Sequence, residues 1–284
     1  MDPDLLAANV KKHAATIDKF LAHKPTAAHT VAAYEAVMDQ IRRSSGLSHP
    51  IEGDDRGRLD GLVLDSGCGT GRSSLLLGQK IHPDAIVIGV DRSLVRLAQN
   101  NNNQQQPQVP SKTGNVSTQN QLLVQHISPN VWLVRAELVD FWRLLFHDPL
   151  VSVQHHYMLY PNPYPKRSRL SSRWYGHASF PLFLQVASHT TTIRSNWELY
   201  LEEMATATRI TTMMPETSLT DFQQNLTGME IQGPYEQKPM EKAWTNFEQK
   251  YWNVGERTFE LVLRRSAAQQ TSSEQEDVSS ATTQ

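Results

Sequence analysis

The chain has 284 residues, with 27 Lys or Arg residues against 29 Asp or Glu residues and a formal net charge of −2 at pH 7. This length is sufficient for one large domain with appendages, and the near-neutral charge gives no overall attraction to nucleic acid. A single cysteine excludes an internal disulfide, and no apolar run is long enough to cross a bilayer. We therefore expect a soluble, cytoplasmic protein with no membrane partner.

The first 50 residues predict an N-terminal helical segment. Proline at position 25 suits the first turn of a helix, and apolar residues then recur at helical spacing until Gly46. Four lysines precede this helix, and the pattern leaves open whether they form a solvated face or face a substrate. They are Lys11, Lys12, Lys19 and Lys24.

The main domain is predicted to span residues 51–265 and to begin with a strand, a helix and a second strand. Short apolar runs at 62–64 and 86–90 have the length of buried parallel strands. Residues 72–79 between them have the pattern of a helix that packs on a sheet. Together they predict one right-handed βαβ unit.

The rest of the chain continues this alternation around one polar insert. Residues 99–121 are rich in Asn, Gln, Pro, Ser and Thr, so we expect a disordered insert there, and residues 266–284 predict a disordered tail. Ser195 and Glu198 form a capping-box pattern that predicts the start of a long helix. Further strands are expected at 130–134, 151–160 and 258–264, and a helix at 137–146.

The turn after the first strand contains Gly67, Gly69 and Gly71. A dinucleotide-binding turn would have its third glycine at position 72, where this chain has Arg72. The carboxylate of Asp65, two residues before the first glycine, disfavours a pyrophosphate and suits a ligand with a positive centre. S-adenosylmethionine (SAM) is therefore favoured over a dinucleotide and over a turn that binds nothing.

Asp91 ends the second strand, where a carboxylate can accept hydrogen bonds from the hydroxyls of a ribose. SAM and a dinucleotide would share this contact. A metal site is not expected, because no His or Cys has a partner at ligand spacing.

Three motifs together resemble those of a known family. Leu64-Asp-Ser-Gly-Cys-Gly-Thr-Gly71, with Gly89-Val-Asp91, resembles the first two cofactor motifs of class I SAM-dependent methyltransferases. Tyr160-Pro-Asn-Pro-Tyr-Pro-Lys166 resembles the Phe-Pro-Asp-Pro-Trp-Pro-Lys signature of the tRNA guanine-N7 methyltransferase (TrmB) family. Thr245-Asn-Phe-Glu248 resembles the closing Thr-x-Phe-Glu motif of that family. The resemblance covers roughly residues 60–265 outside the insert.

The resemblance implies a Rossmann-like α/β fold, with a mostly parallel twisted sheet, helices on both faces and a late antiparallel strand. It also implies that Asp65 and the three glycines hold the methionine part of SAM, that Asp91 holds the ribose and that Glu137 lies near the adenine. Asn162 and Lys166 would be catalytic. The residues implied to bind the substrate are Lys166, Arg169, Arg173, Asn196, Thr245 and Glu248.

Asn162 and Asn196 stand where the family has Asp. Each change removes a charge, keeps an acceptor oxygen and adds an amide donor. Guanine N7 carries a lone pair and needs no proton removed, so direct in-line transfer is compatible with Asn162. Two alternatives stay open. One is an enzyme of this fold that methylates an amino nitrogen or a small molecule, because Asn162-Pro-Tyr164 resembles the Asn-Pro-Pro-Tyr loop of such enzymes. The other is a protein that binds SAM or RNA without catalysis.

A stretch without acidic residues favours an RNA partner. Residues 149–197 contain no Asp or Glu, although the chain has 29, and they contain five basic residues. Aromatic residues lie among these basic residues, as stacking on exposed bases requires. The sequence therefore predicts an RNA-binding loop, with tRNA as the partner that the resemblance implies, and leaves open whether a partner subunit is needed. The basic residues are Lys166, Arg167, Arg169, Arg173 and Arg194.

Overall fold

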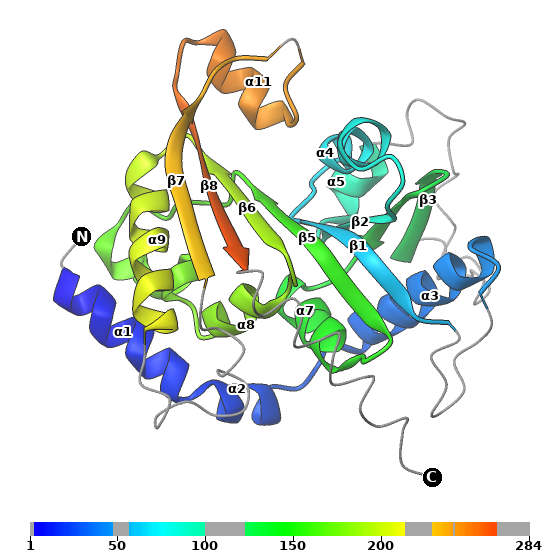
Figure 1. The fold of residues 1–284 in the computed structure, drawn as a ribbon, viewed down its shortest axis with the longest axis horizontal. Coiled ribbons are helices and arrows are strands. Elements are labelled where there is room, and N and C mark those ends of the chain that lie inside the picture. The colour runs from blue at the N-terminus through cyan, green and yellow to red at the C-terminus, as the bar shows by residue number, and fades with distance from the viewer. Residues whose placement is uncertain (1–2, 48–56, 100–122, 214–228, 241, 266–284) are drawn as a thin grey trace. The chain divides into compact units, whose positions relative to one another are not determined.

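The computed structural model of the protein describes residues 3–47, 57–99, 123–213, 229–240 and 242–265 (Figure 1). The predicted tail and all of the predicted insert except Gln99 lie outside these residues. The chain divides into two units that are described separately. The glycine-loop unit comprises Pro25–Leu159 and Pro239–Glu256, and the basic-loop unit comprises Met1–Lys24, Tyr160–Lys238 and Arg257–Gln284.

The glycine-loop unit alternates strands and helices along the chain. Its strands are β1 (Leu59–Ser66), β2 (Val87–Asp91), β3 (Val124–Ser128), β4 (Val131–Arg135) and β5 (Val151–Leu159). Its helices are α3 (Ala28–Ser44), α4 (Arg72–Leu76), the π-helix η1 (Leu77–Ile81), α5 (Leu94–Ala98), α7 (Leu138–His147) and α11 (Asn246–Asn253).

The strands of this unit follow the order β3-β4-β2-β1-β5. β1 is parallel to β2 and to β5, β2 is parallel to β4, and β3 pairs antiparallel with β4. The order reverses direction at β1, which is the switch point where ligands bind in doubly wound sheets. Residues 62–64 of β1 and 87–90 of β2 are buried on both faces of the sheet, so these parts of the strands are continuous apolar runs rather than alternating ones.

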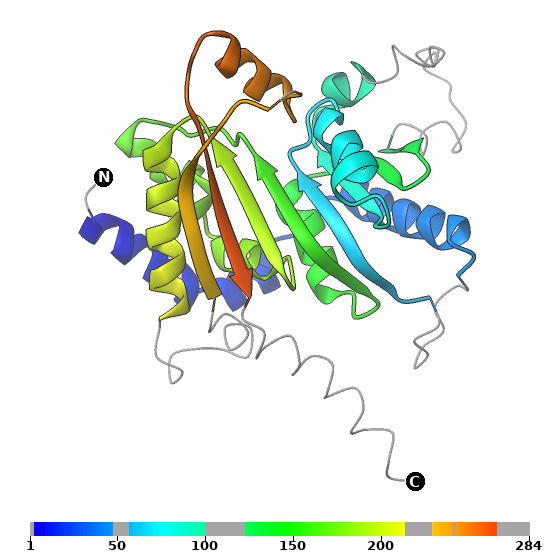
Figure 2. The same cartoon turned by 45° about the horizontal axis from the view of Figure 1, so that its top comes forward.

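Helices cover both faces of this parallel sheet. Right-handed crossovers from β1 to β2 and from β2 to β4 put α4 and α5 on one face, and the return from β4 to β5 puts α7 on the other (Figures 1 and 2). Helix α3 packs with α7, since the Thr30 hydroxyl accepts from the Glu137 N–H at 3.1 Å and the Tyr34 hydroxyl donates to Asp148 at 2.9 Å. Of the apolar residues predicted to recur along this helix, Tyr34, Met38 and Ile41 are buried and Val31 is half-buried.

The basic-loop unit contains an antiparallel sheet with the order β6-β8-β7. Its strands are β6 (Thr190–Ser195), β7 (Met229–Gln237) and β8 (Thr258–Arg265). Its helices are α1 (Pro3–Ala15), α2 (Ile17–His23), the 3-10 helices η3 (Arg167–Ser172) and η4 (Trp174–Gly176), α8 (Phe180–Gln185) and α9 (Glu198–Thr212). Helix α1 buries Leu6, Val10 and Ala14, which recur every four residues, and packs on α8 and α9.

The predicted α/β class is confirmed, with parallel strands first and a late antiparallel strand at β8. Three strands lie outside the sequence predictions: β3, β6 and β7. β7 is an edge strand with the polar sequence Met-Glu-Ile-Gln-Gly-Pro-Tyr-Glu-Gln, so it lacks the alternation that marks a half-buried strand. The domain boundaries at residues 50 and 265 stay a prediction. No helix among the described residues has the length and apolar character required to span a membrane.

Candidate functional site

The glycine loop lies at the carboxyl end of β1, beside β2. Gly67, Gly69 and Gly71 have φ values of 77°, 60° and 79°, which disfavour any residue with a side chain. A Cβ on Gly71 would lie 2.5 Å from the Leu133 side chain, whereas a Cβ on Gly67 or Gly69 would meet no atom within 4 Å. Gly71 is therefore required for packing as well as for conformation, while the backbone at Gly67 and Gly69 borders open space.

Asp65 lies under this loop and is buried, with 1% of its surface exposed. Its Oδ2 accepts from the hydroxyls of Ser73 at 2.6 Å and Ser74 at 2.7 Å, so it ties β1 to the first turn of α4. Its Oδ1 has no hydrogen-bond partner among the described residues. Burial raises the pKa of Asp65 to about 6, against the opposing effect of the two serine hydrogen bonds.

Asp91 supports the glycine loop from the end of β2. Its Oδ2 accepts from the Gly69 N–H at 3.0 Å, and its Oδ1 accepts from the Ser93 N–H at 2.7 Å and lies 3.0 Å from Nη2 of Arg96. A carboxylate has about four acceptor sites, so these three donors leave capacity for one more hydroxyl. Arg96 is not among the residues predicted from the sequence, because it lies on α5 five residues after Asp91 and belongs to no motif.

Buried hydrogen bonds among Ser66, Trp142 and His156 hold the end of β1. The Ser66 hydroxyl accepts from Nε1 of Trp142 at 3.0 Å and lies 2.8 Å from Nε2 of His156. Burial lowers the pKa of His156 to about 3, so the imidazole is neutral at pH 7. These contacts join β1 to α7 and β5 just before the loop begins.

Cys68 within the loop is buried. Burial raises the pKa of its thiol well above the ordinary value, and the nearby carboxylates of Asp65 and Asp91 raise it further. A protonated, buried thiol is a poor nucleophile, so Cys68 acts as a small residue in a tight turn.

Thr245 and Glu248 form the cap of helix α11. The Thr245 hydroxyl accepts from the Glu248 N–H at 3.0 Å, and the Glu248 carboxylate accepts from the Trp244 N–H. Glu248 has no exposed surface, so its carboxylate serves the cap in this structure, and substrate binding by Thr245 and Glu248 stays a prediction. The Thr-x-x-Glu spacing is also the spacing of a capping box, and this use of the motif explains the burial.

Arg72 connects α4 to α11 within the glycine-loop unit. Nη1 of Arg72 donates a hydrogen bond to Oδ1 of Asn246 at 2.9 Å, and Asn246 is the first residue of α11. Arg72, which stands where a dinucleotide-binding turn has glycine, therefore links α4 to the start of α11. Glu137 lies at the start of α7, after β4, with a half-buried side chain that makes no cap hydrogen bond.

In the basic-loop unit, Asn162 lies in an exposed loop after β5. Its Oδ1 accepts from the Tyr164 N–H at 3.2 Å, which closes a turn over Pro163. Tyr160 and Tyr164 on either side have φ values of 56° and 44°. Lys166 follows with an exposed side chain.

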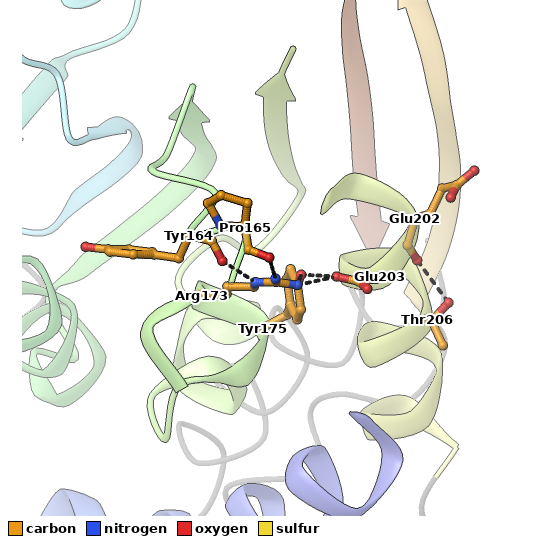
Figure 3. Close-up of polar contacts among 7 residues, drawn as sticks. All are labelled: Tyr164, Pro165, Arg173, Tyr175, Glu202, Glu203 and Thr206. Carbon is orange, nitrogen blue, oxygen red and sulfur yellow. Dashed lines mark hydrogen bonds and ion pairs between the residues drawn. The ribbon is translucent and has the colours of Figure 1, made fainter. Parts of the chain in front are cut away.

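Arg173 differs from the other residues of the predicted RNA-binding set (Figure 3). Only 2% of its surface is exposed, and Nη1 forms an ion pair with Glu203 at 2.7 Å. The guanidinium of Arg173 is therefore engaged inside the protein in this structure, and a contact between Arg173 and RNA stays a prediction. Arg194 is also buried, where it pairs with Glu260 at 2.7 Å, so it is not part of a basic surface either. The exposed basic residues of this loop are Lys166, Arg167 and Arg169.

Asn196 lies half-buried between β6 and α9. The predicted helix begins at Glu198, but the predicted capping box is wrong. The Ser195 hydroxyl accepts from the Trp197 N–H at 3.0 Å instead of from Glu198. Ser195 is the last residue of β6, so its side chain closes a turn between strand and helix.

No protein-family model matches the sequence, and no curated protein matches it. Among solved structures, the chain is similar to the 16S rRNA methyltransferase KamB, with 17% identity and a TM-score of 0.42 over 75% of this chain and 91% of that chain. It is similar to the antibiotic-resistance methyltransferase Kmr, with 14% identity and a TM-score of 0.42 over 81% and 93% of the two chains. It is also similar to the human methyltransferase 10 domain containing protein, with 11% identity and a TM-score of 0.40 over 93% and 99%. Likeness at this level carries no inference about activity.

Proposed function

We propose that the protein is a SAM-dependent methyltransferase that acts on RNA, with N7 of a guanine in tRNA as the target. The observation that carries the proposal is the glycine loop at the switch point of a parallel sheet, braced by Asp91 from the neighbouring strand. This is the position at which doubly wound folds bind nucleotides, and the acidic residue before the loop favours a cationic ligand.

The residues around the loop fit SAM. The orphaned Oδ1 of Asp65 is an acceptor for an ammonium or a bound water, and the open space beside Gly67 and Gly69 admits a ligand against the backbone. Asp91 has acceptor capacity for a ribose hydroxyl, and Glu137 follows the next strand, where an adenine would lie. SAM supplies an activated methyl group on a sulfonium.

The chain's own contribution to the reaction is alignment. Guanine N7 needs no general base, so Asn162 is suited to holding the base rather than removing a proton. Because Oδ1 of Asn162 accepts from the Tyr164 N–H, its amide N–H₂ group is left as a donor. Guanine presents O6 as an acceptor beside N7, and a donor at this point would fix the base for in-line transfer. An amino-nitrogen substrate would instead need the Asn162 oxygen as its principal acceptor.

Three exposed basic side chains, Lys166, Arg167 and Arg169, support an RNA substrate, together with the half-buried rings of Tyr164 and Trp174. Basic groups beside aromatic rings suit phosphate pairing and base stacking. With Arg173 and Arg194 buried, this basic surface is smaller than the sequence predicts.

Nucleoside mass spectrometry tests the proposal. The full chain is incubated with isotopically labelled SAM and either tRNA or ribosomal RNA, and the RNA is digested to nucleosides. We expect labelled 7-methylguanosine from tRNA. Labelled methyladenosine would support the amino-nitrogen alternative, and bound SAM without transfer would support a protein that lacks catalysis; either result contradicts the proposal.

A further inference from the structure

The loop from Tyr160 to Pro165 has a backbone conformation that its residues do not favour. Tyr160 and Tyr164 both have positive φ, at 56° and 44°, in the region that L-residues with large side chains avoid. Such residues persist only where their surroundings hold them, and they are concentrated at functional sites. Something other than local preference must hold this loop.

The two ends of the loop are held in different ways, one by the backbone of Arg194 and the other by the side chain of Arg173. The Tyr160 N–H donates to the backbone oxygen of Arg194 at 2.8 Å, which joins the loop to β6. At the other end, Arg173 donates from Nε to the Tyr164 carbonyl at 3.0 Å and from Nη2 to the Pro165 carbonyl at 3.1 Å (Figure 3). A single buried guanidinium therefore binds both carbonyls that follow the strained turn.

The guanidinium is itself fixed on its other side. Nη1 of Arg173 donates to Glu203 on α9 at 2.7 Å and to the Tyr175 hydroxyl at 2.8 Å, and that hydroxyl donates to Glu203. The Trp197 ring lies against the same group, 5.2 Å from its centre to Cζ of Arg173. A planar fork with donors on three sides makes these contacts together, whereas the single ammonium of a lysine does not.

We propose that Arg173, fixed by Glu203, is a positioning residue that holds the Tyr160–Pro165 loop so that Asn162 meets the target base; this rests on the proposed function. The loop carries the contact with the base, and Arg173 acts on it from behind through the backbone. RNA phosphates are bound by the exposed residues of η3, not by Arg173.

Hydrogen exchange tests the clamp without reference to activity. Arg173→Lys keeps the charge beside Glu203 and loses the simultaneous contacts with both carbonyls. In the segment 160–166 only Tyr160, Asn162, Tyr164 and Lys166 have backbone N–H groups, because Pro161, Pro163 and Pro165 lack them. We expect faster sub-second exchange of these amides in Arg173→Lys. The matched control, Arg169→Lys on the exposed side of η3, should leave their exchange unchanged.

The rate of methyl transfer and the affinity for RNA test the positioning role. For Arg173→Lys we expect a kcat for RNA about 10- to 100-fold below that of the wild type, as for a misplaced reacting group, with SAM affinity and the salt dependence of RNA binding unchanged. Tyr175→Phe removes only the shared hydroxyl, and it serves as a second variant with a smaller loss of the same kind if Arg173→Lys does not fold.

The outcomes separate the clamp from the proposed function. Unchanged exchange in the loop of folded Arg173→Lys overturns the clamp, whatever the activity. A flatter salt dependence of RNA binding in folded Arg173→Gln, which removes the charge, overturns it too, because Arg173 would then contact phosphate. Faster exchange in Arg173→Lys, with a wild type that methylates no RNA, leaves the clamp in place and removes the proposed function.

Discussion

The glycine loop and the basic loop use their predicted residues in opposite ways. In the glycine loop the function of the motif depends on backbone conformation, and each glycine has the positive φ that the motif requires. In the basic loop the sequence predicts a surface of side-chain charge, whereas two of its five basic residues, Arg173 and Arg194, are buried in ion pairs. A residue type that only one conformation tolerates is a more specific signal than a charge, because a charge has both surface and interior uses.

The largest expected effect concerns the cofactor. Asp91→Ala should weaken SAM binding by about 3 kcal/mol or more, at least 100-fold, because the one charged hydrogen bond that Asp91 can still accept from a ribose hydroxyl is worth about 1.5–3 kcal/mol and the support of the loop is lost with it. The variant also loses the brace to the Gly69 N–H. Calorimetry measures the affinity, and Asp60→Ala, at an exposed position of β1, is the control. Equal affinity in Asp91→Ala and wild type would mean that the loop is not a SAM site.

The buried carboxylate of Asp65 predicts a pH dependence of stability. Its pKa is raised from 3.8 to about 6 in the folded protein, so the folded state binds this proton more tightly than the unfolded state does. The stabilisation is complete below about pH 4 and is lost as the pH rises through 6, a change of about 3 kcal/mol. Asp65→Asn removes the titration. Urea unfolding of both proteins from pH 4 to 7.5 measures the difference, and a difference that is constant with pH would contradict the assignment.

The three glycines allow a matched pair of substitutions. Gly67→Ala and Gly71→Ala both place a side chain at positive φ, which costs about 1–2 kcal/mol. Only in Gly71→Ala does the new Cβ lie 2.5 Å from Leu133, a buried core residue. This variant should therefore be less stable than Gly67→Ala by a further 1–3 kcal/mol, roughly the cost of overpacking a core. Denaturant midpoints give both values. Equal losses would show that Leu133 moves aside at little cost.

Most of the parallel sheet could be predicted from sequence, because buried strands and the glycine turn leave patterns within a few residues. Strand β7 could not, since an exposed edge strand with Gly233 and Pro234 has no such pattern. The same limit applies to the side chains of the basic loop. The partners of Arg173 and Arg194 are Glu203 and Glu260, which lie 30 and 66 residues further along the chain. Contacts over such distances depend on the tertiary fold, so the absence of acids from residues 149–197 gave a misleading count of exposed charge.

The smallest expected effect tests what remains of the basic surface. Arg169 is exposed on η3, so Arg169→Ala should remove about one phosphate contact. The log–log slope of RNA affinity against salt should become shallower by roughly 0.7–0.9, with a loss of about 1 kcal/mol or less at moderate salt. Filter binding or fluorescence anisotropy over a range of salt concentrations measures the slope. Arg257→Ala, at an exposed arginine of the same unit that pairs with Glu236, is the control and should leave the slope unchanged. If both variants lose the same slope, the charge acts through the net field of the protein rather than through a contact at η3, and the distinction between the exposed and the buried arginines of this loop would no longer explain RNA binding.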